Sequence, residues 1–333
     1  MLPQLFDPME RPLLDNDGGL IEPLVMVDLD SQATLAPPPA DRLRVGVSTR
    51  EPGAVNSQMA VALDVTLVPQ DGVIGAQVVG CADPWADAEL LHSAAKANPQ
   101  AALVLAQVLR ATRLDVSAAL DLESFAYSTL LSGTEFARWL ALRGPRPLPP
   151  PAPEPPVLVH RAGERLLITL NRPERRNAYG RDVRDALVEA LQLVSLDSTI
   201  ARVVLDGAGP SFCAGGDLDE FGATPDLTTA HLVRTRAGAG RLLYQLADRT
   251  EVHVHGTCVG AGIELPAFAG TVIARPGTVF RLPEVGMGLI PGAGGTVSIA
   301  RRIGRWRTLF LALTGRPLDV TTAFDWGLID AIE

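Results

Sequence analysis

Residues 255–270 read HGTCVGAGIELPAFAG, and this glycine-rich segment with a single acid indicates both an architecture and a chemistry. It follows Val252–His255, a short run with β-branched residues that predicts a strand. Glycines let a ligand approach the backbone closely, and exposed N–H groups beside a helix start attract negative charge. Glu264 stands among apolar residues. Burying an unpaired carboxylate raises the free energy of the folded state by roughly several kcal/mol, so Glu264 is either held by a structural partner or retained for its chemistry.

A second glycine-rich loop, Gly207–Gly216, follows another predicted strand at 201–206. In sheets whose strands alternate with helices, ligands collect beyond the carboxyl ends of the strands, so the two loops are expected to meet there. One backbone N–H from each loop would form an oxyanion hole for a carbonyl oxygen that gains charge. Such a donor stabilises a transition state by about 3–4 kcal/mol. On its own, each loop is equally typical of a tight connection.

A second acid, Glu284, lies in the apolar segment Phe280–Val285. It is interpreted either as an acid on an exposed loop or as a partner of Glu264. Two desolvated carboxylates that face one site have their pKa values pushed apart, so that one is an ionised base and the other a protonated acid. That pair suits the addition of water across a double bond.

The second half of the chain alternates strands with helices, which predicts an α/β fold with parallel pairing and right-handed crossovers. The predicted strands are at 158–160, 166–170, 201–206, 252–255 and 272–274, the first two of them paired, and the predicted helices at 180–194, 228–247, 261–269, 296–303 and 306–314.

The first half of the chain is separated from the second by Gly144–Pro156, GPRPLPPPAPEPP, a proline-dense segment typical of a semi-rigid linker. We therefore predict an N-terminal region over 1–143, a linker over 144–156 and a catalytic core over 157–333. The N-terminal region is expected to begin with a leader of about 36 residues that wraps over the surface or is partly disordered. After it, strands are predicted at 43–48, 61–68 and 73–80 and helices at 86–96, 99–113, 116–131 and 135–143, with Thr134 as the N-cap of the last.

Composition excludes several classes of protein. The chain has 333 residues, 47% of them hydrophobic and 20% charged, which is typical of a globular protein and not of a disordered one. The net charge of −9 argues against nucleic acid as a partner. The charge is uneven, because residues 1–150 hold 18 acidic and 10 basic side chains and residues 151–333 hold 20 and 19, so an anionic ligand is expected on the second half.

The expected compartment is the cytoplasm. Three cysteines form no disulfide framework and show no paired metal-ligand spacing, so neither disulfides nor a metal is expected. The N-terminal sequence has no signal-peptide pattern, and no apolar run is long enough to span a membrane.

Five segments in order make residues 157–333 resemble the crotonase (enoyl-CoA hydratase/isomerase) superfamily. They are ITLNRPERRNAYG at 168–180, SFCAGGDLDEF at 211–221, HGTCVGAGIELPAFAG at 255–270, FRLPEVGMGLIPGAGGT at 280–296 and LTGRPLDVTTAFDWGLID at 313–330. The resemblance implies an α/β fold built as a crotonase-like spiral of ββα repeats, with an α-helical cap and trimerisation region. It also implies an acyl-CoA thioester as the substrate, no cofactor beyond the coenzyme A of that substrate, and a homotrimer or a dimer of trimers.

The resemblance also implies roles for individual residues. Gly216 and Ala261 would supply the oxyanion-hole N–H groups, Glu264 and Glu284 would be the two catalytic acids, and the N–H of Gly292 would position the water. Ala261 stands where many members have glycine, which leaves the donor in place and narrows the pocket. The residues implied in substrate and CoA binding are Arg175, Asn177, Ala178, Ala214, Gly215, Asp217, Leu218, Gly260 and Pro283.

The pair of acids and the family resemblance both favour hydration of a 2-enoyl-CoA to a 3-hydroxyacyl-CoA, with syn addition of water and an enolate held in the oxyanion hole. The alternatives are a crotonase-fold isomerase or thioester hydrolase, whose members often keep only one of the two acids, and a non-catalytic CoA-binding protein. No sequence motif predicts the length of the acyl chain of the substrate.

The ends of the chain depart from the family pattern. Members normally continue beyond the segment that corresponds to 313–330 with helices that cover the active site and build the trimer. Here residues 94–143 are similar to those helices. We therefore expect a permuted order in which the helical cap precedes the core, with the strands before it a remnant of a degenerate crotonase-like half. The alternative is an unrelated N-terminal domain.

Overall fold

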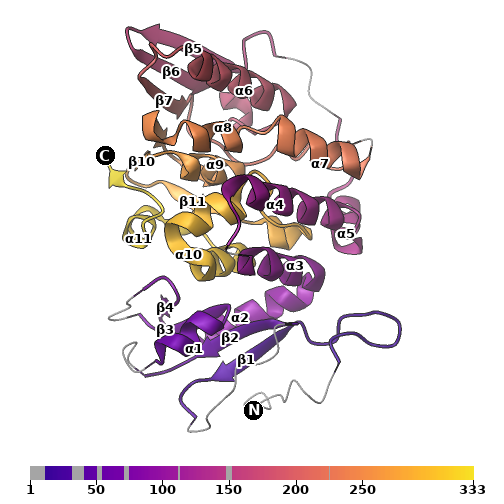
Figure 1. Cartoon of the computed structure of the whole chain (residues 1–333). Coiled ribbons are helices and arrows are strands. Elements are labelled where there is room, and N and C mark those ends of the chain that lie inside the picture. The colour runs from indigo at the N-terminus through magenta and orange to yellow at the C-terminus, as the bar shows by residue number, and fades with distance from the viewer. Residues whose placement is uncertain are drawn as a thin grey trace.

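The computed structural model describes residues 12–31, 41–50, 55–70, 75–111, 113–147, 152–224 and 226–333. In this part of the chain two larger sheets lie on either side of a layer of helices, and a third, three-stranded sheet lies beside one of them. Figure 1 shows the N-terminal sheet at one end, the six-stranded sheet at the other, and helices from both halves of the chain in the middle. The predicted α/β fold is confirmed. None of the described helices is long and apolar enough to cross a membrane.

The six-stranded sheet carries the second half of the chain. Its order is β13-β10-β8-β7-β6-β5, and every pair is parallel except the β5–β6 hairpin. A small sheet of order β12-β11-β9 lies beside it. The strands are β5 Val157–Ala162, β6 Arg165–Leu170, β7 Arg202–Gly207, β8 Thr250–Val254, β9 Thr257–Val259, β10 Thr271–Ala274, β11 Val279–Arg281, β12 Leu318–Asp319 and β13 Ala331–Ile332.

The helices of the second half confirm most of the predicted ranges and correct two. The predicted helix 228–247 is divided at 237–239, where Gly238 lowers helix propensity. The predicted helix 261–269 ends after one turn because Pro266 lacks an N–H, and a 3₁₀ turn follows. The helices are α6 Arg181–Leu196, α7 Leu227–Arg236, α8 Gly240–Gln245, α9 Ala261–Glu264, α10 Gly295–Thr314, which is kinked at Gly304, and α11 Val320–Trp326; the 3₁₀ turns are η2 Pro173–Arg175, η3 Ala247–Arg249, η4 Pro266–Phe268 and η5 Glu284–Met287.

The N-terminal sheet corrects the prediction for the leader. Leu24–Asp28 forms β1, an edge strand paired in parallel with β2, so this part of the leader is ordered in a sheet. The predicted strand 61–68 begins later, since 57–62 is a helix capped by the Asn56 side chain. The predicted strand 73–80 is shortened to 79–81, and residues 71–74 lie outside the described residues. The sheet has the all-parallel order β1 Leu24–Asp28, β2 Leu43–Val47, β3 Val65–Pro69, β4 Val79–Cys81, with α1 Ser57–Ala62 before β3.

Four helices follow this sheet, close to their predicted ranges. Asp83 and Asp115 cap two of them through their carboxylates, while Gly133, and not Thr134, is the N-cap of the last. They are α2 Pro84–Ala97, α3 Pro99–Arg110, α4 Val116–Leu131 and α5 Thr134–Arg143. Of the predicted linker, residues 148–151 lie outside the described part of the chain.

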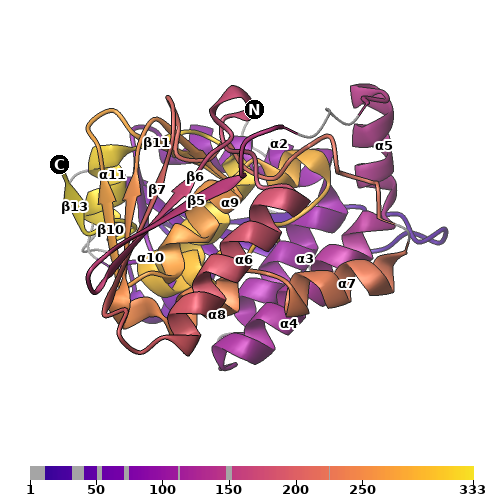
Figure 2. The ribbon, with the colours of Figure 1, turned by 90° about the horizontal axis from the view of Figure 1, so that it is seen from above.

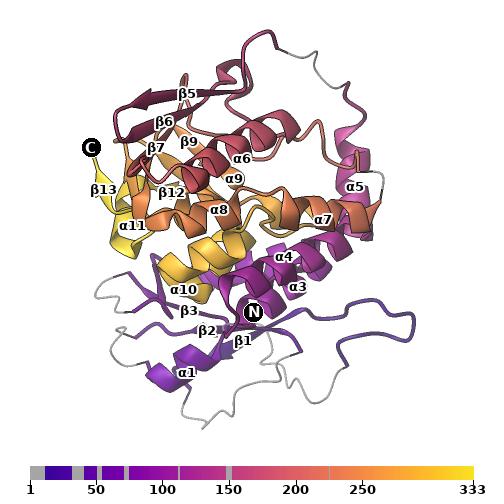
Figure 3. The same cartoon turned by 45° about the horizontal axis from the view of Figure 1, so that its top comes forward.

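The two halves of the chain share one hydrophobic core. Helix α3 packs on α10, and α4 packs along α7, as Figures 2 and 3 both show. Asp64, 1% exposed, is contacted by Arg44, by Arg110 and, across the halves, by Arg305. Although burial opposes it, the guanidinium groups of Arg110 and Arg44 hold the pKa of Asp64 below its ordinary value. A buried ionised group thus ties the N-terminal sheet to α10.

Candidate active site

The two glycine-rich loops meet as predicted. Cys213 and Cys258 form a parallel bridge, and the N–H of Val259 donates to the carbonyl of Cys213 at 3.1 Å. Gly262 packs directly on the Cys213 carbonyl, because a β-carbon there would lie 2.1 Å from that oxygen. The loops that follow β7 and β8 are therefore locked together through their backbones.

The predicted oxyanion-hole donors line one cavity. Gly216 and Ala261, the first from the loop after β7 and the second at the start of α9, both face it. Among the described residues, neither N–H donates a hydrogen bond to another protein group. Both N–H groups are therefore available for a carbonyl oxygen in the cavity.

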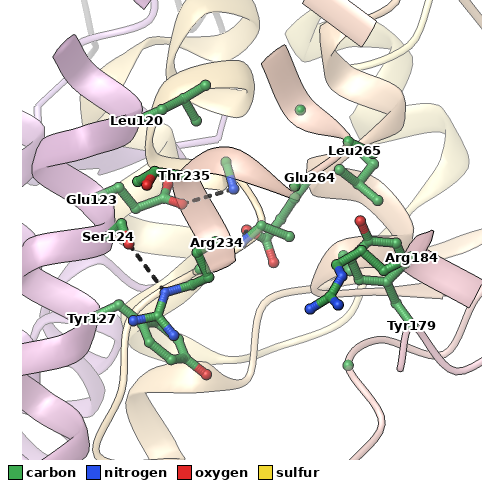
Figure 4. A pocket seen from close by; sticks show the side chains of 18 of the residues that line it. Leu120, Glu123, Ser124, Tyr127, Tyr179, Arg184, Arg234, Thr235, Glu264 and Leu265 are labelled. Carbon is green, nitrogen blue, oxygen red and sulfur yellow. Dashed lines mark hydrogen bonds between the residues drawn. The ribbon is translucent and has the colours of Figure 1, made fainter. Parts of the chain in front are cut away.

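The cavity has a volume of about 210 Å³ and lies between the two halves of the chain. One wall comes from α4, and the others come from the start of α6, the end of α7, α9 and the segment before α10. Figure 4 shows the side chains of α4 facing Glu264 across it. Five residues predicted as catalytic line it: Gly216, Ala261, Glu264, Glu284 and Gly292.

Glu264 is held by the start of α10. Its Oε2 accepts hydrogen bonds from the N–H groups of Ala293 at 2.8 Å and Gly295 at 2.9 Å. The side chain is 2% exposed, and burial raises its pKa to about 7, while these backbone donors oppose the rise. Backbone donors at a helix N-terminus favour the charged form, so Glu264 is the carboxylate best placed to be ionised near neutral pH.

Glu284 differs from Glu264 in its surroundings. Within the described structure its buried Oε2 has no hydrogen-bond partner. Burial, and next the charge of Glu264, raise its pKa well above the ordinary value. Both acids face the same point, since a β-carbon on Gly260 would lie 2.5 Å from Glu284 Oε1 and 3.6 Å from Glu264 Oε1. The two acids therefore share one cavity, and burial raises the pKa of Glu284 more because, among the described residues, it lacks the backbone donors that Glu264 has.

A third carboxylate, which sequence reasoning missed, also lines the cavity. Glu123 of α4 accepts from Gly294 N–H at 2.7 Å and from Thr296 N–H at 2.9 Å and its hydroxyl at 2.6 Å. Burial and the charge of Glu264 raise its pKa to about 8. Two glutamates from opposite halves of the chain thus share the successive N–H groups of residues 293–296. The available signal was an acid within the apolar helix 116–131.

The close approach of the Tyr127 ring leaves no room for a side chain at position 292, which is glycine. A β-carbon there would lie 2.4 Å from ring atoms of Tyr127, which therefore packs flat against this backbone. Its N–H is among the donors that lower the pKa of Glu264. Among the described residues, no group of three or more His, Cys, Asp or Glu side chains is arranged to hold a metal ion.

The residues predicted for substrate and CoA binding lie around the cavity and do not line it. Asn177 is fully buried, and its amide bonds to the backbone of Arg172, Ala208, Ser211 and Phe212, so its side chain fixes the loops. Arg175 is also absent from the cavity wall and pairs with Asp217 and Asp219. The remaining members of the set, none of which lines the cavity, are Ala178, Ala214, Gly215, Asp217, Leu218, Gly260 and Pro283.

We predict that Gly262→Ala destabilises the protein by about 3 kcal/mol and removes activity, because the added methyl group collides with the Cys213 carbonyl and separates the two loops. Urea unfolding measures the change. Gly286→Ala is the matched control, since a β-carbon there meets nothing within 4 Å, and its effect is expected within about 0.5 kcal/mol. Equal unfolding midpoints for the two variants would contradict the contact.

Known proteins resemble the second half of the chain. Residues 163–333 match the sequence family described as enoyl-CoA hydratase/isomerase. The 1,2-epoxyphenylacetyl-CoA isomerase of Escherichia coli K12 is 37% identical over 178 residues, and the 2,3-dehydroadipyl-CoA hydratase of the same organism is 34% identical over 176. These alignments cover 52% and 53% of this chain and 68% of each relative. A crystal structure of an enoyl-CoA hydratase from Mycobacterium smegmatis superposes with a TM-score of 0.50 and 28% identity, over 54% of this chain and 70% of that one.

Proposed function

The chain belongs to the enoyl-CoA hydratase/isomerase family, and on that premise we propose that it adds water to the double bond of a 2-enoyl-CoA to give a 3-hydroxyacyl-CoA. The observation that carries the proposal is the contrast between the two acids. Glu264 rests on backbone N–H groups, whereas Glu284 has a buried oxygen without a partner among the described residues. A hydratase needs such a pair, one group to take a proton and one to give it.

In the proposed mechanism the thioester carbonyl oxygen accepts hydrogen bonds from the N–H groups of Gly216 and Ala261. Ionised Glu264 takes a proton from water as the water oxygen bonds to C3, and the π electrons move onto the thioester as an enolate. The two N–H donors stabilise that charge, each by about 3–4 kcal/mol. Protonated Glu284 then delivers its proton to C2. Exchange of protons with solvent restores both acids.

A second candidate, isomerisation of an enoyl-CoA, is favoured by one observation: the family that residues 163–333 match is described as containing both hydratases and isomerases. Moving a double bond needs a proton removed at one carbon and returned at another, which a single carboxylate near the enolate performs. The pair of acids in one cavity favours hydration over it.

Crotonyl-CoA tests the proposal. Hydration removes the absorbance of the conjugated 2-enoyl thioester and gives a 3-hydroxyacyl product that NMR identifies. A protein that leaves crotonyl-CoA unchanged, but generates the conjugated absorbance from a 3-enoyl-CoA, is an isomerase. Release of free thiol from either compound identifies a thioester hydrolase.

The pH dependence of kcat/KM is expected to be bell-shaped. Glu264 acts as the base and must lose its proton, so activity falls as pH drops through about 7. Glu284 acts as the acid and must keep its proton, so activity falls again at high pH, well above the ordinary glutamate range. Steady-state rates on crotonyl-CoA from pH 5 to 10 measure both limbs, which belong to the coupled cluster. A limb near the ordinary glutamate pKa would contradict the burial of Glu264.

The family resemblance supports a proposal for the assembly, and the cysteine pattern supports one for the compartment. We propose a homotrimer or a dimer of trimers in the cytoplasm, with coenzyme A entering only as part of the substrate. Light scattering on the purified chain measures the assembly.

A further inference from the structure

Arg234, in the last turn of α7, places a cation on the wall of the cavity. Its Nε donates to Ser124 Oγ at 3.2 Å, and its Nη2 donates to Ser128 Oγ. Its Cζ lies 4.6 Å from the centre of the Tyr127 ring. Both acceptors are neutral hydroxyl groups, and no carboxylate of the described residues lies within ion-pair distance of this guanidinium.

The other arginines on this wall differ from Arg234. Arg241 pairs with Asp121 at 2.5 Å, and Arg184 pairs with Asp185 at 2.7 Å. Arg181 is exposed at the start of α6. Arg234 is therefore the partly buried cation on this wall that forms no ion pair among the described residues, and burial lowers its pKa although the charge of Glu123 opposes the shift. A guanidinium removed from water without a counterion costs free energy, which an anionic ligand group offsets.

Arg234 stands one side chain away from the proposed reacting centre. The Tyr127 ring, on which its guanidinium stacks, packs against Gly292, and the next residue, Ala293, donates to Glu264. Figure 4 shows Arg234 and Arg184 on opposite sides of Glu264. Glu123 favours the charged form of Arg234 from a distance, but both its oxygens are hydrogen-bonded by the start of α10 and it forms no ion pair with Arg234 among the described residues. The cation thus lies on the wall of the same cavity as the two acids, one aromatic ring away from the segment that holds Glu264.

We propose that the substrate's acyl group carries a carboxylate remote from the thioester and that Arg234 binds it. The inference rests on the proposed function for the identity of the thioester. Two of the five N–H donors of the guanidinium are used by the serines, and the remaining ones match the planar geometry of a carboxylate. The phosphates of coenzyme A are the other anionic source, and they are common to every acyl-CoA compared in the test.

Pairs of 2-enoyl-CoAs of equal length test the inference, one ending in a carboxylate and the other in a primary amide of the same shape. At the best chain length the wild-type kcat/KM is expected to favour the carboxylate by about 100-fold. Arg234→Met should bring that ratio close to one, and Arg234→Lys, which keeps the charge without the planar fork, should give an intermediate ratio. Arg241→Met is the matched control. It removes a guanidinium from the same wall, but that guanidinium is already paired with Asp121, so the ratio should stay as in the wild type.

The inference is overturned by a wild-type ratio near one at every length, or by a ratio that Arg234→Met leaves unchanged. A purely structural role would lower turnover of both thioesters together and preserve their ratio. Calorimetry with the corresponding saturated acyl-CoAs separates this inference from the proposed hydration. If the protein binds the acid more tightly through Arg234 but hydrates neither enoyl-CoA, carboxylate recognition is supported and the proposed hydration is refuted. If it hydrates both without that preference, hydration is supported and carboxylate recognition is refuted.

Discussion

Glu264→Gln and Glu284→Gln are each expected to lower kcat for enoyl-CoA hydration by about 10²–10⁴-fold, the usual contribution of a positioned acid or base. Glutamine has the shape of glutamate but neither removes a proton from water nor delivers one. Because the two acids act in one step, the double variant should be little worse than the single ones. Stopped-flow or steady-state absorbance on crotonyl-CoA measures the losses.

The control for this pair is Glu135→Gln. Glu135 is also buried and also caps a helix, accepting from Gln100 and Ala101 at the start of α3, but it lies outside the cavity. Its replacement should leave kcat unchanged while lowering stability by about 1 kcal/mol. If Glu264→Gln hydrates crotonyl-CoA as fast as Glu135→Gln, Glu264 is not the base.

Deletion of residues 1–145 is expected to abolish soluble folding. The cavity wall formed by α4 and the packing of α3 on α10 would be lost, together with the contact of Arg305 with Asp64. Apolar surface of the shared core would then face water, at roughly 25 cal/mol per Å². The proposal behind this prediction is that helices 94–143 act as the cap that the family usually places after the core. Expression of fragment 150–333, followed by circular dichroism and a crotonyl-CoA assay, measures the outcome.

A split chain provides the control. Segments 1–147 and 152–333, produced together, keep every described contact between the halves and are expected to assemble into an active complex. A stable, active fragment 150–333 on its own would refute the proposal and favour an unrelated N-terminal domain.

Local sequence patterns predict the longer strands and helices of the second half, whereas the short elements β9, β11, β12, β13 and α11 are not predicted. The two acids, Glu264 and Glu284, follow from apolar segments beside loops that a parallel sheet brings to one edge, whereas Gly216, Ala261 and Gly292 are identified by the family resemblance; all five line the cavity. These residues meet because the strands before them are parallel, and the alternation of strands and helices in the sequence predicts that parallel pairing.

Other features depend on partners that are distant along the chain. Leu24–Asp28 has the apolar, valine-containing run LVMVD, a weak strand signal, and its place in the sheet depends on pairing with β2. Glu123 looks like one polar residue in an apolar helix, while its acceptor role depends on Gly294 and Thr296, 171 and 173 residues later. Asn177 matches a family motif, yet its amide is used entirely by neighbouring backbone. Contacts between residues so far apart in the sequence cannot be predicted from local patterns.

The sharing of the start of α10 by Glu123 and Glu264 has a consequence for folding kinetics. During synthesis α4 leaves the ribosome long before α10, so the apolar face that it will bury against α7 and α10 stays without its partners while most of the chain is made. Contacts of such high sequence separation are typical of slow folding. The nascent chain should therefore depend on chaperones that shield α4, and catalytic competence should be acquired as one of the last events of folding.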